Sequence, residues 1–516
     1  MIQRTAEIVL VAANARYAHT ALGPRCLLAN LGDLRPRAAL LEATADDRPA
    51  DVAERILAFA PRVVGMSAFV WSVALLTEVA SILRRVAPGV RLVVGGPEVI
   101  CAGDLPRLAS LADVVVHGEA DLAFADVARR LLAGETTLPH LLDAPPPDLS
   151  RVAKPYGEYS DADLAHRTVY IEASRGCPNG CEFCLSSVSP RVRRFPEERV
   201  LEAMGELWER GARRFKFVDR SIDLAVTPRL LDFFLDRAGD GVFVHFEVVP
   251  DRIPAPLFER IARFPRATVQ LEAGVQTLDD AVAARIGRRQ QGARVEVELK
   301  RLVAETEAHV HADLVVGLPG EGIDGVADSF DRLQGTGVHE IQIGVLKRLR
   351  GAPIARHDAA FGMAYRDAPP YDVLATSAID FATMQRLKRA ARYHDLVCNS
   401  GRFPRAAALL LGAASPFGAI LELAGFLHER VGASAGIALP RLASLLFEHL
   451  TKIRGMPPGE VADAIADDYC GEARRRLPRE IREHVTRWPP TTLGVDPSPR
   501  QEVVPVRQRR RARRSL

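Results

Sequence analysis

Three of the chain's seven cysteines, Cys177, Cys181 and Cys184, fall within eight residues of one another. Thiolates are soft donors that select zinc or iron–sulfur centres. A closed structural zinc site or a fully ligated cluster uses four ligands, so three thiolates leave one position open. The spacing therefore predicts a 4Fe–4S cluster with one iron free to bind an outside ligand.

Structural zinc and disulfides are the alternative uses of these cysteines. Zinc would need a fourth ligand, but His166 lies eleven residues before the loop and His245 is far downstream. Three thiols cannot form two disulfides, and a reducing cytoplasm disfavours disulfides. Gly176 and Gly180 let the backbone turn tightly, so that amide N–H groups can point at a negatively charged cluster. These residues favour the cluster.

The spacing Cys-x-x-x-Cys-x-x-Cys, with Phe183 just before the last cysteine, resembles the defining motif of the radical S-adenosylmethionine (SAM) superfamily. The resemblance implies that Cys177, Cys181 and Cys184 hold the cluster and that Phe183 lies near the adenine of SAM. In that family the amino and carboxylate groups of SAM bind the free iron, and reductive cleavage gives a 5′-deoxyadenosyl radical.

Length and composition set the class of protein. A chain of 516 residues is too long to pack around a single hydrophobic core of ordinary size, and this length indicates about three domains. Its 48% hydrophobic and 26% charged residues are typical of a soluble globular protein, and a net charge of +3 gives no argument for nucleic acid or membrane partners. The apolar runs Ile8–Ala13 and Ala406–Leu421 fit neither a signal peptide nor a membrane span. We expect a cytoplasmic protein.

Short apolar runs separated by helical patterns fill the first 140 residues. This alternation predicts a parallel doubly wound sheet, whose ligands bind beyond the carboxyl ends of the strands. The expected strands are Glu7–Ala13, Ala38–Leu41, Val63–Ser67, Arg91–Gly95 and Asp113–His117, and the expected helices are Leu22–Leu31, Asp51–Phe59, Val73–Val86 and Leu122–Leu132. The proline-rich segment Asp143–Asp148 is expected to be a linker.

A second alternating pattern begins near Thr168, and its six β/α units predict a partial or open barrel. The active site of such a barrel lies at the carboxyl ends of its strands, and the cysteine loop follows the first of them. The expected strands are Thr168–Ala173, Phe215–Val218, Val242–Val248, Thr268–Ala273, His311–Val316 and Glu340–Leu346, with helices such as Pro196–Arg210 and Pro228–Ala238 between them.

After about Gly351 the pattern becomes helical. The expected helices are Tyr371–Tyr393, Arg405–Leu411, Ile420–Arg430 and Pro440–Ile453. The final segment, Arg507–Arg514, has six arginines in eight residues and is expected to be a solvated, disordered tail. An RNA- or phosphate-binding arm is the alternative for this tail.

Small residues end two strands of the first sheet. Ser67 ends the third strand and Gly95-Gly96 ends the fourth, whereas the Gly-x-Gly-x-x-Gly of a dinucleotide site is missing after the first strand. These residues either leave room for a large flat ligand or form ordinary tight turns, and by themselves they favour neither. The serine with the later Gly-Gly resembles the cobalamin-binding domain of methyltransferases and mutases.

That resemblance implies cobalamin-binding roles for Ser67, Gly95 and Gly96, and for Glu119 in a stretch similar to the same domain ahead of radical SAM modules. The family's Asp-x-His-x-x-Gly motif is missing, so no lower axial ligand of cobalt is assigned. Tyr17, after the first strand, is expected to cover the cobalt face in place of a histidine.

Taken whole, the sequence resembles the cobalamin-binding radical SAM proteins that carry a C-terminal domain of unknown function. The similar segments are Asn14–Tyr17, Lys216–Arg220, Glu272–Gln276, Gly317–Glu321 and Leu346–Gly351, and the resemblance covers roughly residues 1–500. It implies SAM-binding roles for residues after successive barrel strands. These are Phe183, Asp219 for the SAM amino group, Glu272 and Gln276 for the ribose, and Gly317 and Glu321 beside the adenine.

The expected fold class is α/β, with a doubly wound (Rossmann-like) cobalamin-type domain, a partial (β/α)6 TIM-like radical SAM barrel and a C-terminal helical domain. The expected boundaries are 1–140 for the first domain, 141–165 for a linker, 166–355 for the barrel, 356–500 for the helical domain and 501–516 for the tail. The expected cofactors are a 4Fe–4S cluster, SAM and cobalamin.

The resemblance implies a radical SAM enzyme that uses cobalamin to methylate an unreactive carbon of a small-molecule or peptide substrate. A one-electron reductant such as flavodoxin or ferredoxin would be its partner. Two alternatives stay open: a radical enzyme that rearranges or oxidises its substrate without methylation, and a non-catalytic corrinoid or iron–sulfur carrier. The products of SAM distinguish them, because only methylation yields S-adenosylhomocysteine and a heavier product.

Overall fold

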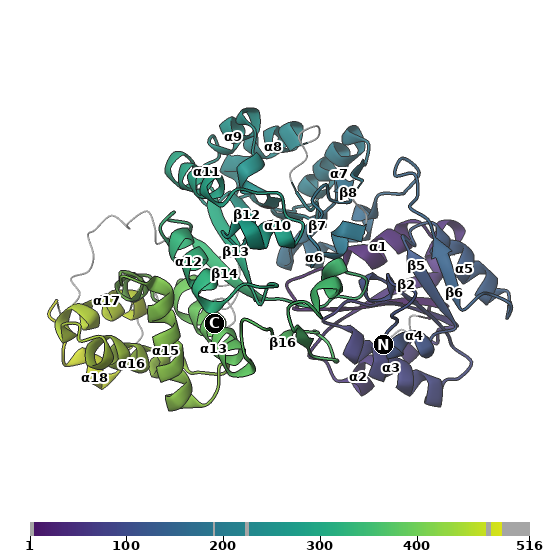
Figure 1. Cartoon of the computed structure of the whole chain (residues 1–516). Coiled ribbons are helices and arrows are strands. Elements are labelled where there is room, and N and C mark those ends of the chain that lie inside the picture. Colours follow the sequence, from purple (N-terminus) through teal and green to yellow (C-terminus); the bar gives the residue numbers. More distant parts are fainter. Residues whose placement is uncertain (1–4, 189–190, 222–226, 471–475, 488–516) are drawn as a thin grey trace.

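A computed structural model describes residues 5–188, 191–221, 227–470 and 476–487. Figure 1 shows three parts in sequence order: a sheet domain (purple), a central barrel (teal) and a group of C-terminal helices (green to yellow). The first part contains a parallel sheet in the order β2-β1-β3-β4-β5-β6. Its strands are β1 (Ile8–Asn14), β2 (Ala38–Thr44), β3 (Val63–Ser67), β4 (Arg91–Gly95), β5 (Val114–Gly118) and β6 (Leu141–Ala144).

Helices cover both faces of this sheet, as the uniformly buried β1 requires. The helices α1 (Leu22–Ala29) and α5 (Ala123–Leu132) bury Leu28 and Phe124 in one core. On the other face, α2 (Pro49–Leu57) and α3 (Val73–Val86) bury a second core. The doubly wound sheet that the sequence predicts is confirmed.

The segment expected to be a linker contains regular structure. The strand β6 pairs with β5 at the edge of the first sheet, and α6 (Asp161–His166) begins at a capping box made by Ser160 and Asp163. The strand is only four residues long and is followed directly by prolines, which explains why the sequence was interpreted as a linker.

The second part is a six-stranded parallel sheet in the order β14-β13-β12-β11-β10-β7. Sequential strands lie side by side, as in a barrel that has been opened at one seam. The strands are β7 (Val169–Ile171), β10 (Arg214–Phe217), β11 (Phe243–Val248), β12 (Val269–Gln276), β13 (His309–Val316) and β14 (Glu340–Val345). The helices around them are α7 (Glu197–Glu209), α8 (Thr227–Leu235), α9 (Ala255–Ile261), α10 (Asp280–Arg285), α11 (Gly292–Glu305) and α12 (Ile323–Gln334).

The C-terminal part is mostly helical. It contains α13 (Phe381–His394), α14 (Pro404–Leu411), α15 (Pro416–Val431), α16 (Leu439–Glu448), α17 (Pro458–Cys470) and α18 (Arg479–Arg482). It shares one hydrophobic core with the barrel, and Phe330 of α12 packs against Phe417 of α15 with ring centroids 5.5 Å apart. Asn399 hydrogen bonds to both the N–H and the carbonyl of Ile341, which covers the edge strand β14.

The expected helix Tyr371–Tyr393 is wrong at its start. The helix α13 begins at Phe381, because the side chain of Asp380 accepts a hydrogen bond from the N–H of Thr383 and acts as the N-cap. The preceding residues form a short hairpin of β15 (Ala364–Tyr365) and β16 (Val373–Ala375). The predicted basic tail, Arg507–Arg514, lies outside the described residues.

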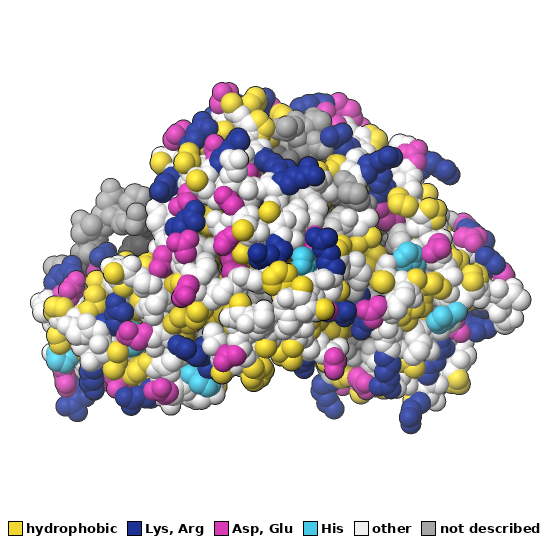
Figure 2. All heavy atoms as spheres, viewed as in Figure 1, with side chains coloured by type: hydrophobic (Ala, Val, Ile, Leu, Met, Phe, Trp, Pro, Cys, Tyr) yellow, Lys and Arg dark blue, Asp and Glu magenta, His cyan; other side chains and the backbone are white. Residues whose placement is uncertain are grey.

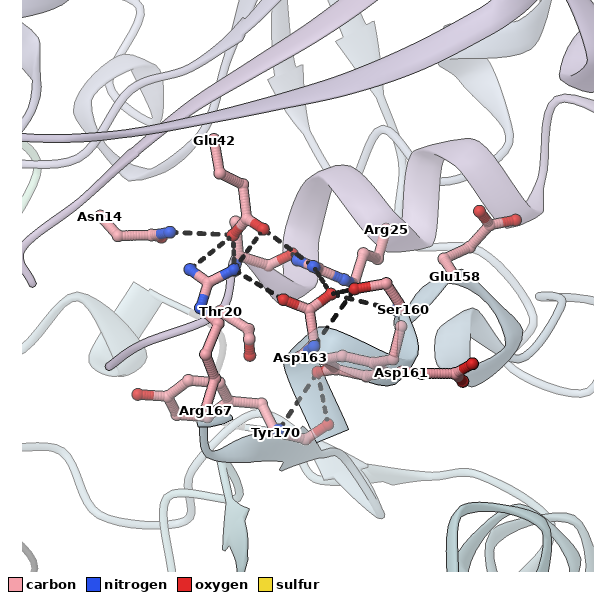
Figure 3. Close-up of polar contacts among 12 residues, drawn as sticks. Asn14, Thr20, Arg25, Glu42, Glu158, Ser160, Asp161, Asp163, Arg167 and Tyr170 are labelled. Atoms are coloured by element: carbon pink, nitrogen blue, oxygen red, sulfur yellow. Dashed lines mark hydrogen bonds and ion pairs between the residues drawn. The ribbon is translucent and has the colours of Figure 1, made fainter. Parts of the chain in front are cut away.

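A buried network of ion pairs joins the first domain to the segment that leads into the barrel (Figure 3). Arg25 of α1 donates to Glu42 of β2 at 2.8 Å and to Asp163 of α6 at 2.9 Å. Arg167 donates to the same two carboxylates at 2.7 and 2.8 Å. Two guanidinium groups and two carboxylates thus neutralise one another out of water, and the orientation of the two domains depends on this pairing.

The surface and the helices give two further observations. Positive and negative side chains intermix over the face seen in Figure 2, in agreement with a net charge of only +3. No single helix in the described part of the chain is long and apolar enough to cross a membrane, although the bent pair α14 and α15 passes that test together.

Candidate functional site

The cysteine loop follows β7 and the two-residue strand β8 (Ser174–Arg175). Gly176 has a φ of +96°, a conformation that favours glycine, and it turns the chain toward Cys177. Cys177 and Cys181 are buried, and Cys184 is half-buried. Burial raises the pKa of Cys177, and the neighbouring Cys184 and Cys181 thiols raise it further.

Three cysteines in one loop are the kind of donor set that a 4Fe–4S cluster uses. One zinc ion requires ligand atoms within about 2.3 Å of a single point. Among the described residues, no three His, Cys, Asp or Glu side chains are arranged to hold one metal ion. Cluster ligands each bind a different iron, so they need not converge on a single point, and the three cysteines stay the predicted cluster ligands.

Two carboxylates brace the ends of the loop. Asp219, after β10, accepts hydrogen bonds from the N–H of Ala173 at 3.0 Å and from the hydroxyl of Ser174 at 2.5 Å. Burial raises the pKa of Asp219 to about 7. Glu182, between the second and third cysteines, lies 2.8 Å from Nε2 of His357 and accepts from Nε of Arg356. Residues far apart in the sequence therefore fix the loop.

Most of the predicted SAM-binding residues lie at the carboxyl ends of the barrel strands or in the loops that follow, but Glu272, which was expected after a strand, lies in the middle of β12. Gln276 ends β12 in an irregular register beside β13 and has a φ of +72°, a strained value for a residue with a side chain. Phe183 packs against the edge of the core. Glu321 is buried and accepts from the Thr277 hydroxyl at 2.6 Å, and burial raises its pKa to about 7.

Gly317 has a packing explanation in this structure. Its φ is +87°, and a Cβ added there would lie 2.5 Å from Cγ1 of Val373 and 3.1 Å from Cε of Met384. The C-terminal part of the chain thus fills the space beside this glycine. The expectation that Gly317 admits the adenine stays a prediction.

Polar side chains project from alternate positions of the central barrel strands, opposite the apolar positions that pack under the helices. Glu272 of β12 lies 3.1 Å from Nζ of Lys216 and 2.8 Å from Nε2 of His245. Burial opposes ionisation of Glu272, but the contacts with His245 and Lys216 outweigh it and lower its pKa. His311 and Asp313 of β13 face each other at 3.2 Å.

The charge state of His245 follows from the same surroundings. Burial lowers the pKa of His245 to about 4, so its imidazole is neutral at pH 7 and can accept or donate a hydrogen bond. The sequence analysis did not identify His245, His311 or Asp313 as site residues. For His245 the signal was present in the segment Phe243–Val248, whose alternate residues Val244, Phe246 and Val248 are apolar and buried while the face that carries His245 is half-buried.

The predicted cobalamin-binding residues gather at the carboxyl edge of the first sheet. The strand order reverses between β1 and β3, and ligands of doubly wound sheets bind at such a point. Ser67 and Gly95 are register partners at the ends of β3 and β4. Gly96, with a φ of +108°, is needed for packing, because a Cβ there would lie 2.7 Å from the carbonyl oxygen of Ala68. Tyr17 is 54% exposed beside this edge.

Trp71 is a residue of this edge that the sequence analysis missed. Its indole N–H donates to the carbonyl of Ala13 at 3.0 Å, and its ring stacks on Phe69 with centroids 4.5 Å apart. The side chain bridges the ends of β1 and β3 and is 45% exposed. An exposed tryptophan so close to Ser67 in the sequence was the available signal.

Glu119, the fifth predicted cobalamin residue, connects the two domains. Its carboxylate lies 2.7 Å from Nη1 of Arg175, two residues before Cys177, and it also pairs with Arg193. Arg175 reaches Asp121 at 2.8 Å and Glu172 at 3.0 Å as well. Arg175 with these three carboxylates is called the Arg175 cluster below. It holds the carboxyl edge of the first sheet against the cysteine loop.

A doubly wound sheet whose ligand edge meets a cysteine-bearing partial barrel defines a B12-binding radical SAM protein. Family comparisons agree: residues 8–128 match the B12 binding domain and residues 171–333 match the Radical SAM superfamily. Residues 359–487 match a protein family of unknown function, DUF4080, so the chain is a B12-binding radical SAM protein with a DUF4080 C-terminal domain. The predicted family and fold class are confirmed, and the cofactors of these domains are cobalamin, SAM and a 4Fe–4S cluster.

Two relatives by sequence are methyltransferases. The chain is 26% identical over 349 residues to 2-(S-pantetheinyl)-carbapenam-3-carboxylate methyltransferase of Streptantibioticus cattleyicolor, covering 60% of this chain and 50% of the relative. It is 24% identical over 334 residues to the cobalamin-dependent radical SAM methyltransferase TokK of Streptomyces tokunonensis, covering 57% and 48%. The chain therefore spans about half the length of these relatives.

Solved structures show the same fold at low identity. The cobalamin-dependent SAM radical enzyme OxsB, with aqua-cobalamin and SAM bound, superposes with a TM-score of 0.60 at 13% identity, covering 94% of this chain and 83% of that one. The radical SAM methyltransferase TsrM of Kitasatospora setae superposes with a TM-score of 0.56 at 16% identity, covering 71% and 80%.

Proposed function

We propose that this protein is a cobalamin-dependent radical SAM methyltransferase that acts on an unreactive carbon of a small-molecule or peptide substrate. The observation that carries the proposal is the Arg175 cluster, which joins the ligand edge of the B12-binding domain to the loop of three cysteines. A radical made on one side and a methyl group delivered from the other must reach the same carbon, so the two cofactor sites must face each other.

The two similar methyltransferases support the choice of reaction. When bound, the cofactors supply reductive cleavage of SAM and delivery of a methyl group. In this proposal Cys177, Cys181 and Cys184 hold the cluster. The proposed SAM ligands are Phe183, Asp219, Glu272, Gln276, Gly317 and Glu321, and the proposed cobalamin ligands are Tyr17, Ser67, Gly95, Gly96 and Glu119.

Some of these roles gain physical support from their surroundings. Burial raises the pKa of Asp219 to about 7, and a bound ammonium group would supply a positive charge that favours the ionised carboxylate. Glu272 is held ionised by Lys216 and His245, which suits an acceptor for two ribose hydroxyls. Packing within the chain does not require glycine at position 95, since an added Cβ would make only an ordinary contact, 3.7 Å from the carbonyl oxygen of Val116.

We also propose the functional division of the chain into a cobalamin domain (1–140), a connection (141–165), a radical SAM barrel (166–355), a helical domain (356–500) and a basic tail (501–516). The protein acts in the cytoplasm with a flavodoxin or ferredoxin as its one-electron donor.

The test is anaerobic purification with cobalamin supplied, followed by turnover with a reductant and mass analysis of the SAM products. We expect both 5′-deoxyadenosine and S-adenosylhomocysteine, and a substrate heavier by one methyl group. The variant Cys181→Ala should lose SAM cleavage and keep cobalamin binding, because the two cofactors bind different domains.

Two results would overturn the proposal. Deoxyadenosine without S-adenosylhomocysteine across a broad substrate screen would indicate a radical rearrangement or oxidation. A protein that binds cluster and cobalamin but never consumes SAM would be a carrier.

A further inference from the structure

Arg288 is a buried cation that differs from the other buried arginines near the domain boundary. Its side chain lies just after α10, and the residue is 7% exposed. Arg25, Arg167 and Arg175 each pair with at least two carboxylates. Among the described residues, Arg288 forms an ion pair with none: its donors reach Oε1 of Gln290, the carbonyl of Gly274 and Sγ of Cys181.

A buried guanidinium without a counter-ion is costly, because its charge loses water and gains no opposite charge. The one partner of Arg288 that can become an anion is Cys181, whose Sγ lies 3.5 Å from Nη1. A thiol that coordinates a metal is deprotonated outright. The charge of Arg288 is therefore compensated when the cysteine loop holds its cluster.

The backbone around Arg288 fixes this contact. Gly287 has a φ of +72°, and a Cβ there would lie 2.5 Å from the carbonyl oxygen of Gly180 in the cysteine loop. The N–H of Glu182 donates to the carbonyl of Ile286 at 2.9 Å. Chain segments that touch at two backbone points leave little freedom for the guanidinium to move away from the sulfur.

The same side chain also holds the end of β12. It donates to the carbonyl of Gly274, beside the irregular register that ends at the strained Gln276. Gln290 adds bonds to the carbonyls of Val275 at 3.0 Å and Thr277 at 2.6 Å. Arg288 thus connects a cluster ligand to the strand end where we propose that SAM binds.

We propose that Arg288 is a positioning residue that sets the reduction potential of the cluster, through a charge-assisted N–H···S bond to Cys181. The inference rests on the cluster of the proposed function and not on methyl transfer. Reduction adds one electron from a one-electron donor and changes no bond. A cation and a hydrogen bond at a ligand sulfur favour the state with the extra negative charge, and so raise the potential.

The test compares Arg288→Gln, Arg288→Lys and Arg289→Gln in the full chain, reconstituted anaerobically with iron and sulfide. The cluster is titrated with dithionite and followed by electron paramagnetic resonance, without SAM or cobalamin. Arg289 is the matched control, because it is the next residue and exposed, so solvent screens its charge. Iron content and circular dichroism confirm equal loading and folding.

For Arg288→Gln we expect the ratio of reduced to oxidised cluster at a fixed potential to fall at least tenfold, a shift of about 59 mV for one electron. Arg288→Lys should shift less, since it keeps the charge and loses the planar fork. Arg289→Gln should match the wild type. A fully loaded Arg288→Gln with the wild-type midpoint overturns the inference.

If Arg288→Gln does not bind the cluster, the midpoint potential of Arg288→Lys decides whether the inference holds. In that case a wild-type midpoint in a fully loaded Arg288→Lys refutes the role, and a lowered midpoint in Arg288→Lys supports it. A wild-type chain that takes up no cluster refutes the proposed function itself, so the two failures are distinguishable.

Discussion

Arg175 is the side chain whose removal tests the domain arrangement most directly. It is 13% exposed and contacts Glu119, Asp121 and Glu172, which are themselves 25%, 8% and 16% exposed. Changing Arg175 to methionine keeps most of the side-chain volume and removes the cation that three carboxylates share, of which Glu119 keeps Arg193 as a second partner. Breaking a buried ion pair from one side costs about 3–5 kcal/mol.

This cost should appear as local opening rather than global unfolding, because the Arg175 cluster lies at the contact between two separately packed cores. A loss of 3 kcal/mol raises the population of the opened state by a factor of about 100. Amide hydrogen exchange of the full chain measures this factor. We expect it in peptides that cover the end of β5 and the cysteine loop, with little change in α15.

Arg229→Met is the matched control. Arg229 also has two carboxylate partners, Glu197 at 2.9 Å and Glu198 at 2.6 Å, but it is 51% exposed, so solvent already screens the pair. Asp121→Asn in the Arg175→Met background should restore part of the protection, because it removes the negative charge that Arg175 compensated at 2.8 Å. Equal exchange in Arg175→Met and Arg229→Met would refute the reasoning.

Two further predictions concern stability and use thermal unfolding of the full chain. Because burial raises the pKa of Glu321 from 4.5 to about 7, the unfolded state ionises first as pH rises, and this residue reduces stability progressively between pH 4.5 and 7. Glu321→Gln should match the wild type at pH 4 and exceed it by about 3 kcal/mol at pH 8, whereas exposed Glu209→Gln should show no such trend. Gly118→Ala should lower the midpoint temperature of unfolding, since the φ of Gly118 is +102° and a Cβ there would lie 2.1 Å from the carbonyl oxygen of Ala144. The control Gly205→Ala in α7, with open space around it, should raise the midpoint temperature. A raised midpoint temperature in Gly118→Ala would contradict backbone strain at this position.

Periodicity predicted most strands because buried parallel strands carry a strong local signal. The strands β3 and β4 and the helix α3 have the predicted bounds, and the barrel strands differ by one to three residues at their ends. The misses share a cause: β6, β15 and β16 have four residues or fewer, and they depend on partners elsewhere in the chain. A strand of four residues or fewer is too short for its alternating pattern to be distinguished from a loop sequence.

The cysteine motif is recognisable from the sequence because its three cysteines lie within eight residues of one another, and their role as cluster ligands stays a prediction. The polar partners of the site could not be recognised in this way, because they are distant in sequence. Arg175 and Asp121 are 54 residues apart, Glu182 and His357 are 175 apart, and Arg288 and Cys181 are 107 apart. Each such pair depends on how two elements dock, which no local pattern encodes.

A comparison of the charged partners of the buried arginines adds a functional residue, Arg288, to the cysteine motif. Arg25, Arg167 and Arg175 are each neutralised by carboxylates, so their contacts explain their burial through stability alone. Arg288 is equally buried, and among the described residues it has no carboxylate partner; its missing negative charge is located at Cys181. A protein that buries an unpaired cation against a ligand sulfur is organised around an anion bound there, and the cysteine spacing identifies that anion as a cluster.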